Sequence, residues 1–183
     1  MATPGATGLS TLDDARRVLL EDAVRAAPLV SAEEGPVLDV GSGGGSPGIP
    51  LAVLLPGRSF TLLEAERRKC DFLRRVTADL PNVDVVWARA EERPLETEAV
   101  ALAKALAKPP VAAELCLPLV RRGGAAILWV GESADLEHVA RVAEALGGEL
   151  ESAANGLAVL RKRRATPAGF PRRAGMAKKR PLP

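Results

Sequence analysis

Residues 37–52 read VLDVGSGGGSPGIPLA, an apolar strand that runs directly into a glycine-rich turn and then into a helix. The run Pro36–Val40 is typical of a buried parallel strand, and Ile49–Leu55 is predicted to be a helix that stops at Pro56. Glycines between them let the backbone turn tightly and let a ligand approach without an intervening Cβ. This order of elements indicates a doubly wound α/β sheet with a ligand site at the turn.

Strands and helices alternate along the rest of the chain. Asn155-Gly156 is a strong two-residue turn signal, so the last two strands are predicted to form a hairpin. The alternation predicts a mostly parallel, seven-stranded sheet covered on both faces, with an antiparallel strand at its C-terminal end. The predicted strands are Pro36–Val40, Phe60–Glu64, Val83–Trp87, Val100–Ala103, Ala125–Val130, Glu149–Ala153 and Gly156–Leu160. The predicted helices are Leu12–Val30 with Thr11 as its N-cap, Ile49–Leu55, Ala65–Leu80, Val111–Val120 and Ala134–Leu146.

Composition narrows the class of protein. The 183 residues are 47% hydrophobic and 26% charged, which is typical of one globular domain. No run approaches the roughly 20 apolar residues of a membrane helix, and the first twelve residues lack the features of a secretory signal. Two cysteines and one histidine are too few for a disulfide framework or a zinc site. We expect a cytoplasmic monomer without a metal.

The net charge of +2 hides a strong asymmetry. Residues 161–183 carry nine basic residues and no acid, whereas the other 160 residues carry 16 basic and 23 acidic ones. A globular domain at residues 1–162, with a leader at 1–10, is therefore predicted to precede a basic tail at 163–183. Such tails usually bind a polyanion, above all nucleic acid, although a solvated end without a function is the alternative. The candidate RNA contacts in the tail are Arg164, Arg172, Arg173, Lys178, Lys179 and Arg180. Deleting residues 166–183 is expected to leave the fold and the affinity for a small cofactor nearly unchanged.

Two carboxylates select the ligand of the glycine turn. A pyrophosphate would sit on the helix N-terminus here, and Asp39, two residues before the first glycine, would repel it. The same carboxylate suits a ligand that carries an ammonium or a sulfonium group. Glu64 ends the second strand, where it can accept hydrogen bonds from both hydroxyls of a ribose, unless it is merely an exposed acid. The pattern favours S-adenosylmethionine over a nicotinamide dinucleotide.

The same segment closely resembles the first motif of the RsmG (GidB) family, which methylates N7 of a guanine in the RNA of the small ribosomal subunit. The continuation Pro47-Gly48-Ile49-Pro50 is more specific than the glycines alone. The resemblance implies a class I S-adenosylmethionine-dependent methyltransferase with a Rossmann-like fold. Further similar segments are Phe60–Glu64 with Arg68, Phe72 and Leu73, Ala88–Glu92, Leu117–Leu119 before Gly123-Gly124, Phe170–Gly175 and Lys178–Leu182.

The resemblance also implies roles for individual residues. Gly41 and Ser46 would line the methionine part of the cofactor together with Asp39 and Gly43, and Glu64 would bind the ribose. Ala90 and Glu91 would flank the adenine, and Lys104 matches an arginine of the family. The chain departs from the family's usual pattern at Ser46, at Lys104 and at Val130-Gly131.

Methylation of guanine N7 needs no catalytic acid or base, because N7 has a free lone pair and no proton. Orientation of the reactants can supply most of the acceleration, so no catalytic residue is predicted. Arg89 and Lys104 are the candidate residues lining the site, and Arg89 is a further candidate RNA contact. Cys70 and Cys116 are predicted to be core residues and His138 a surface residue. The predicted partner is 16S ribosomal RNA or the small subunit; the alternatives are an inactive RNA-binding relative and a small-molecule methyltransferase.

Overall fold

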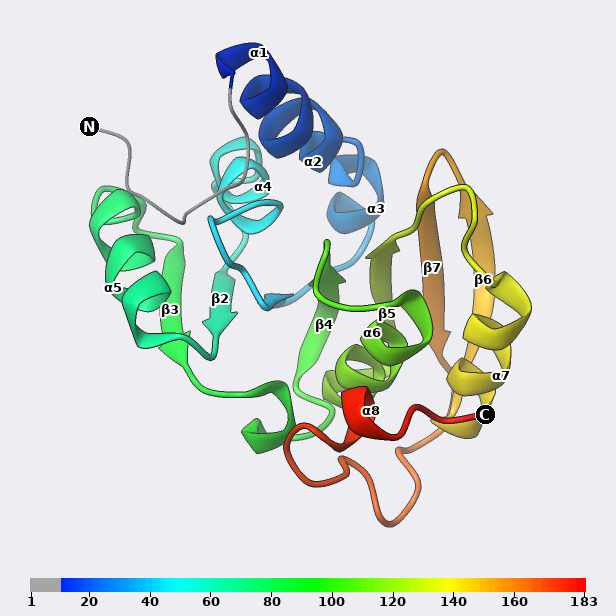
Figure 1. Ribbon diagram of the computed structural model, residues 1–183. Helices are drawn as coiled ribbons and strands as arrows, with labels where there is room; N and C mark the ends of the chain where they lie inside the picture. The colour runs from blue at the N-terminus through cyan, green and yellow to red at the C-terminus, as the bar shows by residue number, and fades with distance from the viewer. Residues whose placement is uncertain (1–10) are drawn as a thin grey trace.

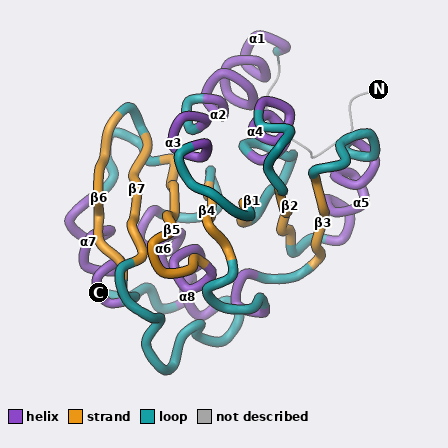
Figure 2. The backbone as a smooth tube through the Cα atoms, turned by 180° about the vertical axis from the view of Figure 1, so that it is seen from behind, coloured by secondary structure: helices purple, strands orange, loops and turns teal. Residues whose placement is uncertain are grey.

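The structure of the chain, a computed structural model, describes residues 11–183 (Figure 1). The leader predicted at residues 1–10 lies outside the described residues. One seven-stranded sheet has the order β3-β2-β1-β4-β5-β7-β6. Figure 2 shows β3 and β6 at its two opposite edges. The strands are β1 (Val37–Val40), β2 (Phe60–Glu64), β3 (Val83–Trp87), β4 (Glu98–Ala103), β5 (Val120–Trp129), β6 (Gly148–Ala154) and β7 (Leu157–Lys162).

The pairing of the strands confirms the predicted fold class. Strands β3, β2, β1, β4 and β5 are mutually parallel, and β7 runs antiparallel to both β5 and β6. At the centre, Val37 pairs with Phe60 on one side and with Val100 on the other. Every residue of β1 and β4 is buried, which is why these strands are short, nearly continuous apolar runs.

Helices cover both faces of the sheet and create two apolar cores. One core packs α3 and α4 against β1, β2 and β4, and the other packs α6, α7 and α8 against the opposite face. Cys116 and Cys70 are both buried, as predicted. The helices longer than three residues are α1 (Leu12–Ala15), the π-helix η1 (Arg16–Glu21), α3 (Ala27–Ser31), α4 (Gly48–Leu54), α5 (Arg67–Val76), α6 (Pro109–Cys116), α7 (Leu136–Ala145) and α8 (Met176–Lys179). The three-residue helices are α2 (Asp22–Val24), η2 (Ala90–Glu92) and η3 (Leu117–Leu119).

The N-terminal helix differs from its prediction. Thr11 is its N-cap, and the Thr11 hydroxyl accepts a hydrogen bond from the Asp14 amide at 3.0 Å. The single helix expected over Leu12–Val30 is instead divided into α1, η1, α2 and α3, and Pro28 lies in the first turn of α3. Apolar spacing alone could not distinguish the wider π turn from an α turn.

The strand β5 also begins earlier than predicted. Leu117–Leu119 form a 3-10 turn, and Val120 already pairs with Glu98 of β4. The pair Gly123-Gly124 therefore lies inside a strand and not in a turn before it. A Cβ at Gly124 would lie 2.4 Å from the Ala99 carbonyl oxygen, so glycine permits a close approach of two backbones here.

The segment after β7 is packed against the body of the protein. The ammonium of Lys162, which is fully buried, donates hydrogen bonds to the carbonyls of Leu117 and Leu146 and to the hydroxyl of Thr166. Phe170 and Leu182 pack against the core around α6. In Figure 1 this segment curves back so that α8 lies beside α6.

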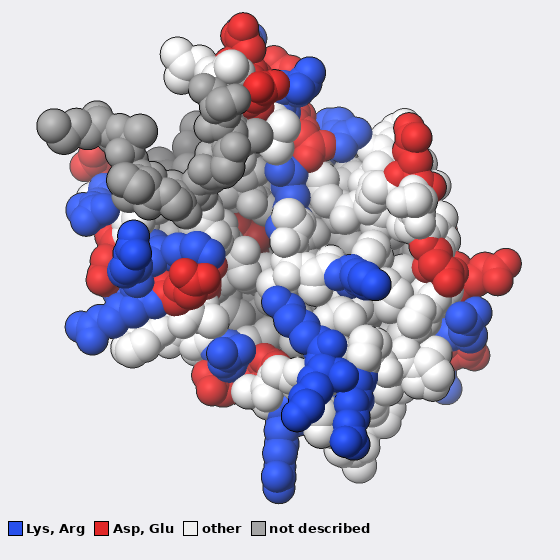
Figure 3. Space-filling view, in the orientation of Figure 1, with Lys and Arg blue, Asp and Glu red and all other residues white. Residues whose placement is uncertain are grey.

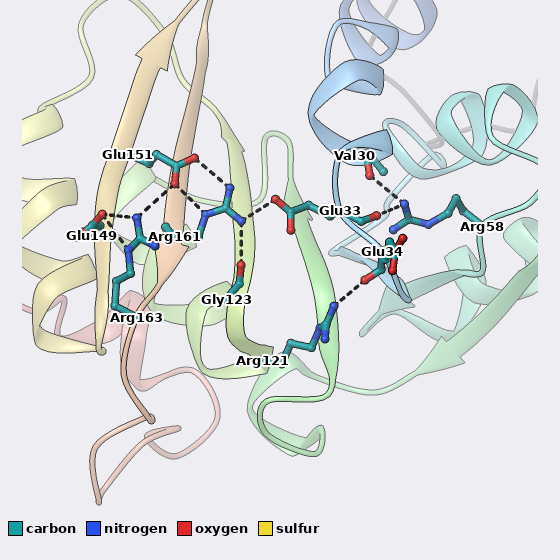
Figure 4. A network of polar contacts seen from close by, with 10 residues as sticks. All are labelled: Val30, Glu33, Glu34, Arg58, Arg121, Gly123, Glu149, Glu151, Arg161 and Arg163. Carbon is teal, nitrogen blue, oxygen red and sulfur yellow. Dashed lines mark hydrogen bonds and ion pairs between the residues drawn. The ribbon is translucent and has the colours of Figure 1, made fainter.

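Ion pairs join the far edge of the sheet to the turn before β1 (Figure 4). Arg161 bonds to Glu151 at 2.8 Å and to Glu33 at 2.5 Å, and Arg163 bonds to Glu149 at 2.7 Å. These two arginines belong to the basic end of the sequence, but their charges are neutralised by acids of the body. The C-terminal region therefore has fewer unpaired positive charges than the nine basic residues of its sequence suggest.

Candidate functional site

A cavity of about 570 Å³ opens at the carboxyl ends of β1, β2, β3 and β4. Its volume lies within the range of about 300–1,000 Å³ that is usual for small-molecule sites. The walls come from the glycine turn, the β2–α5 connection, the β3–η2 connection and the residues after β4. Two further walls come from the two ends of the described chain, η1 and α8. The cavity lies where a doubly wound sheet places its ligand.

The glycine turn is shaped by left-handed backbone conformations. Gly41, Gly43 and Gly45 have φ values of +73°, +54° and +96°, which disfavour any residue with a Cβ. The amides of Gly41 and Ser42 both donate to the Leu63 carbonyl, at 2.8 and 3.0 Å, so the turn is tied to the end of β2. A Cβ at Gly43 would find only the Gly41 oxygen within 4 Å, at 3.8 Å, so this part of the turn borders open space.

Glu64 stands at the end of β2 and faces the cavity. One carboxylate oxygen accepts a hydrogen bond from the Gly43 amide and the other from the Glu66 amide, both at 2.9 Å. A carboxylate offers about four acceptor positions, so Glu64 keeps capacity for two more donors. The glycine turn orients this acid, and a ribose with two adjacent hydroxyls fits the remaining capacity.

Asp39 lies beneath the turn and does not line the cavity. It is 1% exposed, and its Oδ2 accepts a hydrogen bond from the Gly48 amide at 3.1 Å, while Oδ1 has no partner among the described residues. Burial raises the pKa of this carboxyl to about 7. Asp39 is bonded to the Gly48 amide at the end of the turn. It would therefore affect a ligand only indirectly, through the conformation of the turn or through the electric field of its carboxylate.

Lys104 and Ser46 both line the cavity, and both donate hydrogen bonds to the helix η1. The Lys104 ammonium donates to the Val18 carbonyl at 2.7 Å and lies 3.4 Å from Asp22. The Ser46 hydroxyl donates to the Leu19 carbonyl at 2.9 Å. Two positions that depart from the family pattern therefore hold η1 over the cavity.

The C-terminal segment closes the side of the cavity that contains Ala90 and Glu91. The Gly175 amide donates to the Glu91 carboxylate at 2.8 Å, and Gly175, Ala177 and Lys178 line the cavity. Arg172 forms two hydrogen bonds of 2.6 Å with Glu114, which is only 4% exposed. This pairing raises the pKa of the Arg172 guanidinium. A buried acid of α6 thus fixes the segment in place.

Seven of the eight predicted cofactor residues line this one cavity, and Asp39 is the exception. Of the predicted RNA contacts, Arg89 and Lys178 line the cavity, Arg172 is paired with Glu114, and the others are exposed. They are Arg164, Arg173, Lys179 and Arg180. His138 is half-buried, with a ring nitrogen 2.8 Å from the Leu182 carbonyl oxygen.

Sequence reasoning missed both end walls. Val18 and Leu19 belong to a helix whose apolar spacing indicated burial but not a cavity. The small residues Gly175 and Ala177 interrupt a basic run, and that interruption was the available signal for packing. Within residues 11–183, no group of three or more His, Cys, Asp or Glu side chains is arranged to hold a metal ion. No helix in the same range is long and apolar enough to cross a membrane.

Solved structures of other proteins share the fold of this chain. M. jannaschii TYW2 in complex with AdoMet matches with a TM-score of 0.60 at 20% identity, over 76% of this chain and 71% of that one. A SAM-dependent O-methyltransferase from Thermotoga maritima matches with a TM-score of 0.61 at 12% identity, over 80% of this chain and 67% of that one. The fold, with its antiparallel β7, is that of the class I S-adenosylmethionine-dependent methyltransferases.

Sequence comparison identifies the family. The family described as "GidB: rRNA small subunit methyltransferase G" matches residues 5–155. The ribosomal RNA small subunit methyltransferase G of Rubrobacter xylanophilus is 40% identical over 92% of this chain and 70% of its own length. That of Symbiobacterium thermophilum is 37% identical over 95% of this chain and 82% of its own length. The chain belongs to the rRNA small subunit methyltransferase G family, a family of S-adenosylmethionine-dependent methyltransferases.

Proposed function

We propose that this protein transfers a methyl group from S-adenosylmethionine to N7 of a guanine in 16S ribosomal RNA. The observation that carries the proposal is the single cavity in which the glycine turn, Glu64 and the Ala90–Glu91 turn meet beside a basic rim. The fit of a ribose to Glu64 and of a small cofactor to the cavity volume supports the cofactor. Family membership supports the substrate.

In this proposal each wall of the cavity binds a different part of the cofactor. Glu64 accepts hydrogen bonds from the ribose, and Ala90 and Glu91 flank the adenine. Gly41, Gly43 and Ser46 border the methionine part, with Lys104 beside them and Asp39 supporting the turn from below. The bound cofactor supplies a methyl group on a sulfonium, which is an electrophile without further activation.

Catalysis in this proposal rests on orientation. A guanine N7 carries no proton, so no residue has to act as a general base on it. Positioning of nucleophile, methyl carbon and leaving sulfur can account for several kcal/mol of the barrier. The walls formed by η1 and α8 would exclude water and narrow the approach to the cofactor.

The RNA would approach across the face shown in Figure 3, where Lys and Arg side chains gather over the region of α8. Arg173, Lys178, Lys179 and Arg180 are exposed, and no ion pair involves them among the described residues. Arg89 on the rim and Arg164 farther away would add phosphate contacts. Arg172 would act differently, by holding the segment that carries the other cations. We place the protein in the cytoplasm as a monomer that acts on this RNA or on the small subunit.

The test is to map N7-methylguanine in 16S ribosomal RNA from cells with and without the gene. We expect one modified guanine to disappear with the gene and to return on incubation with purified protein and S-adenosylmethionine. In parallel, Glu64→Ala should weaken binding of S-adenosylhomocysteine by about 1–3 kcal/mol in calorimetry. An unchanged methylation pattern would overturn the proposed substrate, and undiminished binding by Glu64→Ala would overturn the proposed cofactor pose.

A further inference from the structure

Trp87 is a large aromatic residue that the core does not use. The chain has three Phe, two Trp and no Tyr, and residues 1–10 contain none of them. Trp87 is 54% exposed, whereas Phe60 is fully buried and Phe72, Trp129 and Phe170 are half-buried. An exposed indole costs free energy in water and is enriched at binding surfaces, which calls for a binding explanation.

The ring of Trp87 is held in one orientation. Its indole N–H donates to the Ala65 carbonyl at 3.0 Å, and the Arg67 guanidinium lies 5.5 Å from the ring centroid. Ala65 belongs to the connection between β2 and α5, and Arg67 is the first residue of α5. Because these contacts fix the ring before any ligand arrives, little side-chain entropy remains to be lost on binding.

Trp87 does not itself line the cavity, but its neighbours along the chain and its hydrogen-bond partner do. Trp87 ends the edge strand β3, and Ala88 and Arg89, which follow it, line the cavity. Ala65, to which the indole is bonded, lines it too. A group stacked on Trp87 would therefore be a close neighbour of a guanine that enters the cavity.

The charges around the ring suit a polyanion. Arg67, Arg68 and Arg89 are exposed, and none of them forms an ion pair among the described residues. Nearby acids already have partners: Glu66 bonds to Lys69 at 2.8 Å, and Glu92 accepts from the Arg89 amide at 2.9 Å. An aromatic face with neighbouring arginines is a common arrangement for an unpaired RNA base and its phosphate.

We propose that Trp87, with Arg67, forms a stacking platform for an unpaired base that neighbours the target guanine. This inference rests on the proposed function, because it assumes an RNA substrate. The platform lies on the β3 side of the cavity, and the basic residues of α8 lie on another wall, so the RNA would be held from two sides. Trp87 is then a specificity-determining residue for a single-stranded substrate, and Arg67 contributes a phosphate contact.

The first experiment makes Trp87 the reporter. In a Trp129→Phe protein, Trp87 is the only tryptophan, and a stacked base should quench its fluorescence. We expect saturable quenching on titration with purified 16S ribosomal RNA and with single-stranded oligoadenylate, and little quenching with a fully paired RNA duplex. An RNA that binds without changing this fluorescence would overturn the platform. This measurement needs no methyl transfer, so it separates a failure of the platform from a failure of the proposed reaction.

The second experiment compares Trp87→Leu with Trp87→Phe. Leucine keeps apolar area but cannot stack, so the KM for 16S ribosomal RNA should rise about 5- to 160-fold, the range for loss of one stacked base. Phenylalanine should restore most of the affinity, and affinity for S-adenosylhomocysteine should stay within twofold in both variants. Val76→Ala changes an exposed apolar residue at the end of the neighbouring helix α5; it is the matched control and should leave the KM unchanged.

Arg67→Gln completes the series. It should weaken RNA binding less than Trp87→Leu and reduce the log–log salt slope by somewhat under 1. An unchanged KM in Trp87→Leu contradicts the inference. A changed oligomeric state with unchanged RNA affinity would assign the exposed face to a protein interface along the β3 edge and would also contradict it.

Discussion

The N-terminal helices and the C-terminal segment close the same cavity by different means. η1 contributes Val18 and Leu19 from one side, and the segment around α8 contributes Gly175, Ala177 and Lys178 from the other. The side chains of Lys104 and Ser46 hold η1 through two uncharged backbone carbonyls. The C-terminal segment is held through a buried carboxylate, Glu114.

Because of this difference, the free-energy cost of losing the holding contact differs between the two walls. A carbonyl that loses a side-chain donor near a cavity can be hydrated at small cost. A buried carboxylate that loses its guanidinium remains as an unpaired charge in an apolar core, which is far more costly. We therefore infer that the C-terminal wall is fixed and that the N-terminal wall is the more readily opened of the two.

The largest effect is expected from Arg172→Met, which strands the Glu114 carboxylate. The free energy of unfolding should fall by about 3 kcal/mol, as for other broken buried pairs. Affinity for S-adenosylhomocysteine should fall too, since Gly175–Lys178 would no longer be held against the cavity. Arg173→Met is the matched control, because Arg173 is exposed and has no ion pair among the described residues, and it should change neither quantity. Equal stabilities for the two variants in urea denaturation would contradict the comparison.

The next effect is a pH dependence of stability that comes from Lys162, the last residue of β7. Burial lowers the pKa of the Lys162 ammonium to about 8, against an ordinary value near 10.5. Between these two values the unfolded chain binds more protons than the folded one. The free energy of unfolding should therefore rise from about pH 8 to pH 10, with up to about 3 kcal/mol from Lys162.

Lys162→Met should remove that rise, and Lys179→Met, which replaces an exposed lysine, should keep it. Chemical denaturation at pH 7.5 and pH 10 would measure the difference. A rise that persists in Lys162→Met would mean that another group titrates.

Smaller effects are expected at the N-terminal wall. Ser46→Ala removes one hydrogen bond to η1 and should cost about 1 kcal/mol of stability. Hydrogen exchange should show faster opening of η1 amides, with little change in the amides of α8. Similar losses at both walls would show that the two are coupled and not independently fastened.

The smallest effect on stability is expected from Lys104→Arg, which keeps the positive charge near Asp22 and restores the family's usual residue. The planar guanidinium can make two parallel hydrogen bonds where the ammonium is a point charge. Folding should be intact, and methyl transfer should be equal or higher. Lower activity in a stable variant would show that this site is built differently from that of its relatives.

The strands and the cofactor turn could be predicted because local chemistry determines them. Phe60–Glu64 and Val83–Trp87 have the predicted bounds, and the glycine turn lies where the switch from strand to helix periodicity placed it. The central strand β4 was predicted only over Val100–Ala103, because Glu98 and Ala99 gave no local strand signal.

Contacts between distant segments could not be predicted in the same way. Nine basic residues with several prolines indicated an RNA arm that could be deleted without loss of cofactor binding. The pairing of Arg172 with Glu114, 58 positions away, is invisible to charge counting, as is the burial of Lys162. With these contacts we now expect deletion of residues 166–183 to weaken cofactor binding. Asp39 was expected beside the ligand, but sequence spacing cannot show that its side chain points beneath the turn.

The position of α8 has a consequence for the order in which the enzyme matures. Synthesis runs from the N-terminus, and domains form as the chain emerges from the ribosome. The residues that line the cavity from α8 are made after all seven strands of the sheet. A nascent chain can therefore complete its sheet while the cavity that we propose for the cofactor still lacks one wall. The capacity to bind the methyl donor would be acquired last, after the body of the protein has formed.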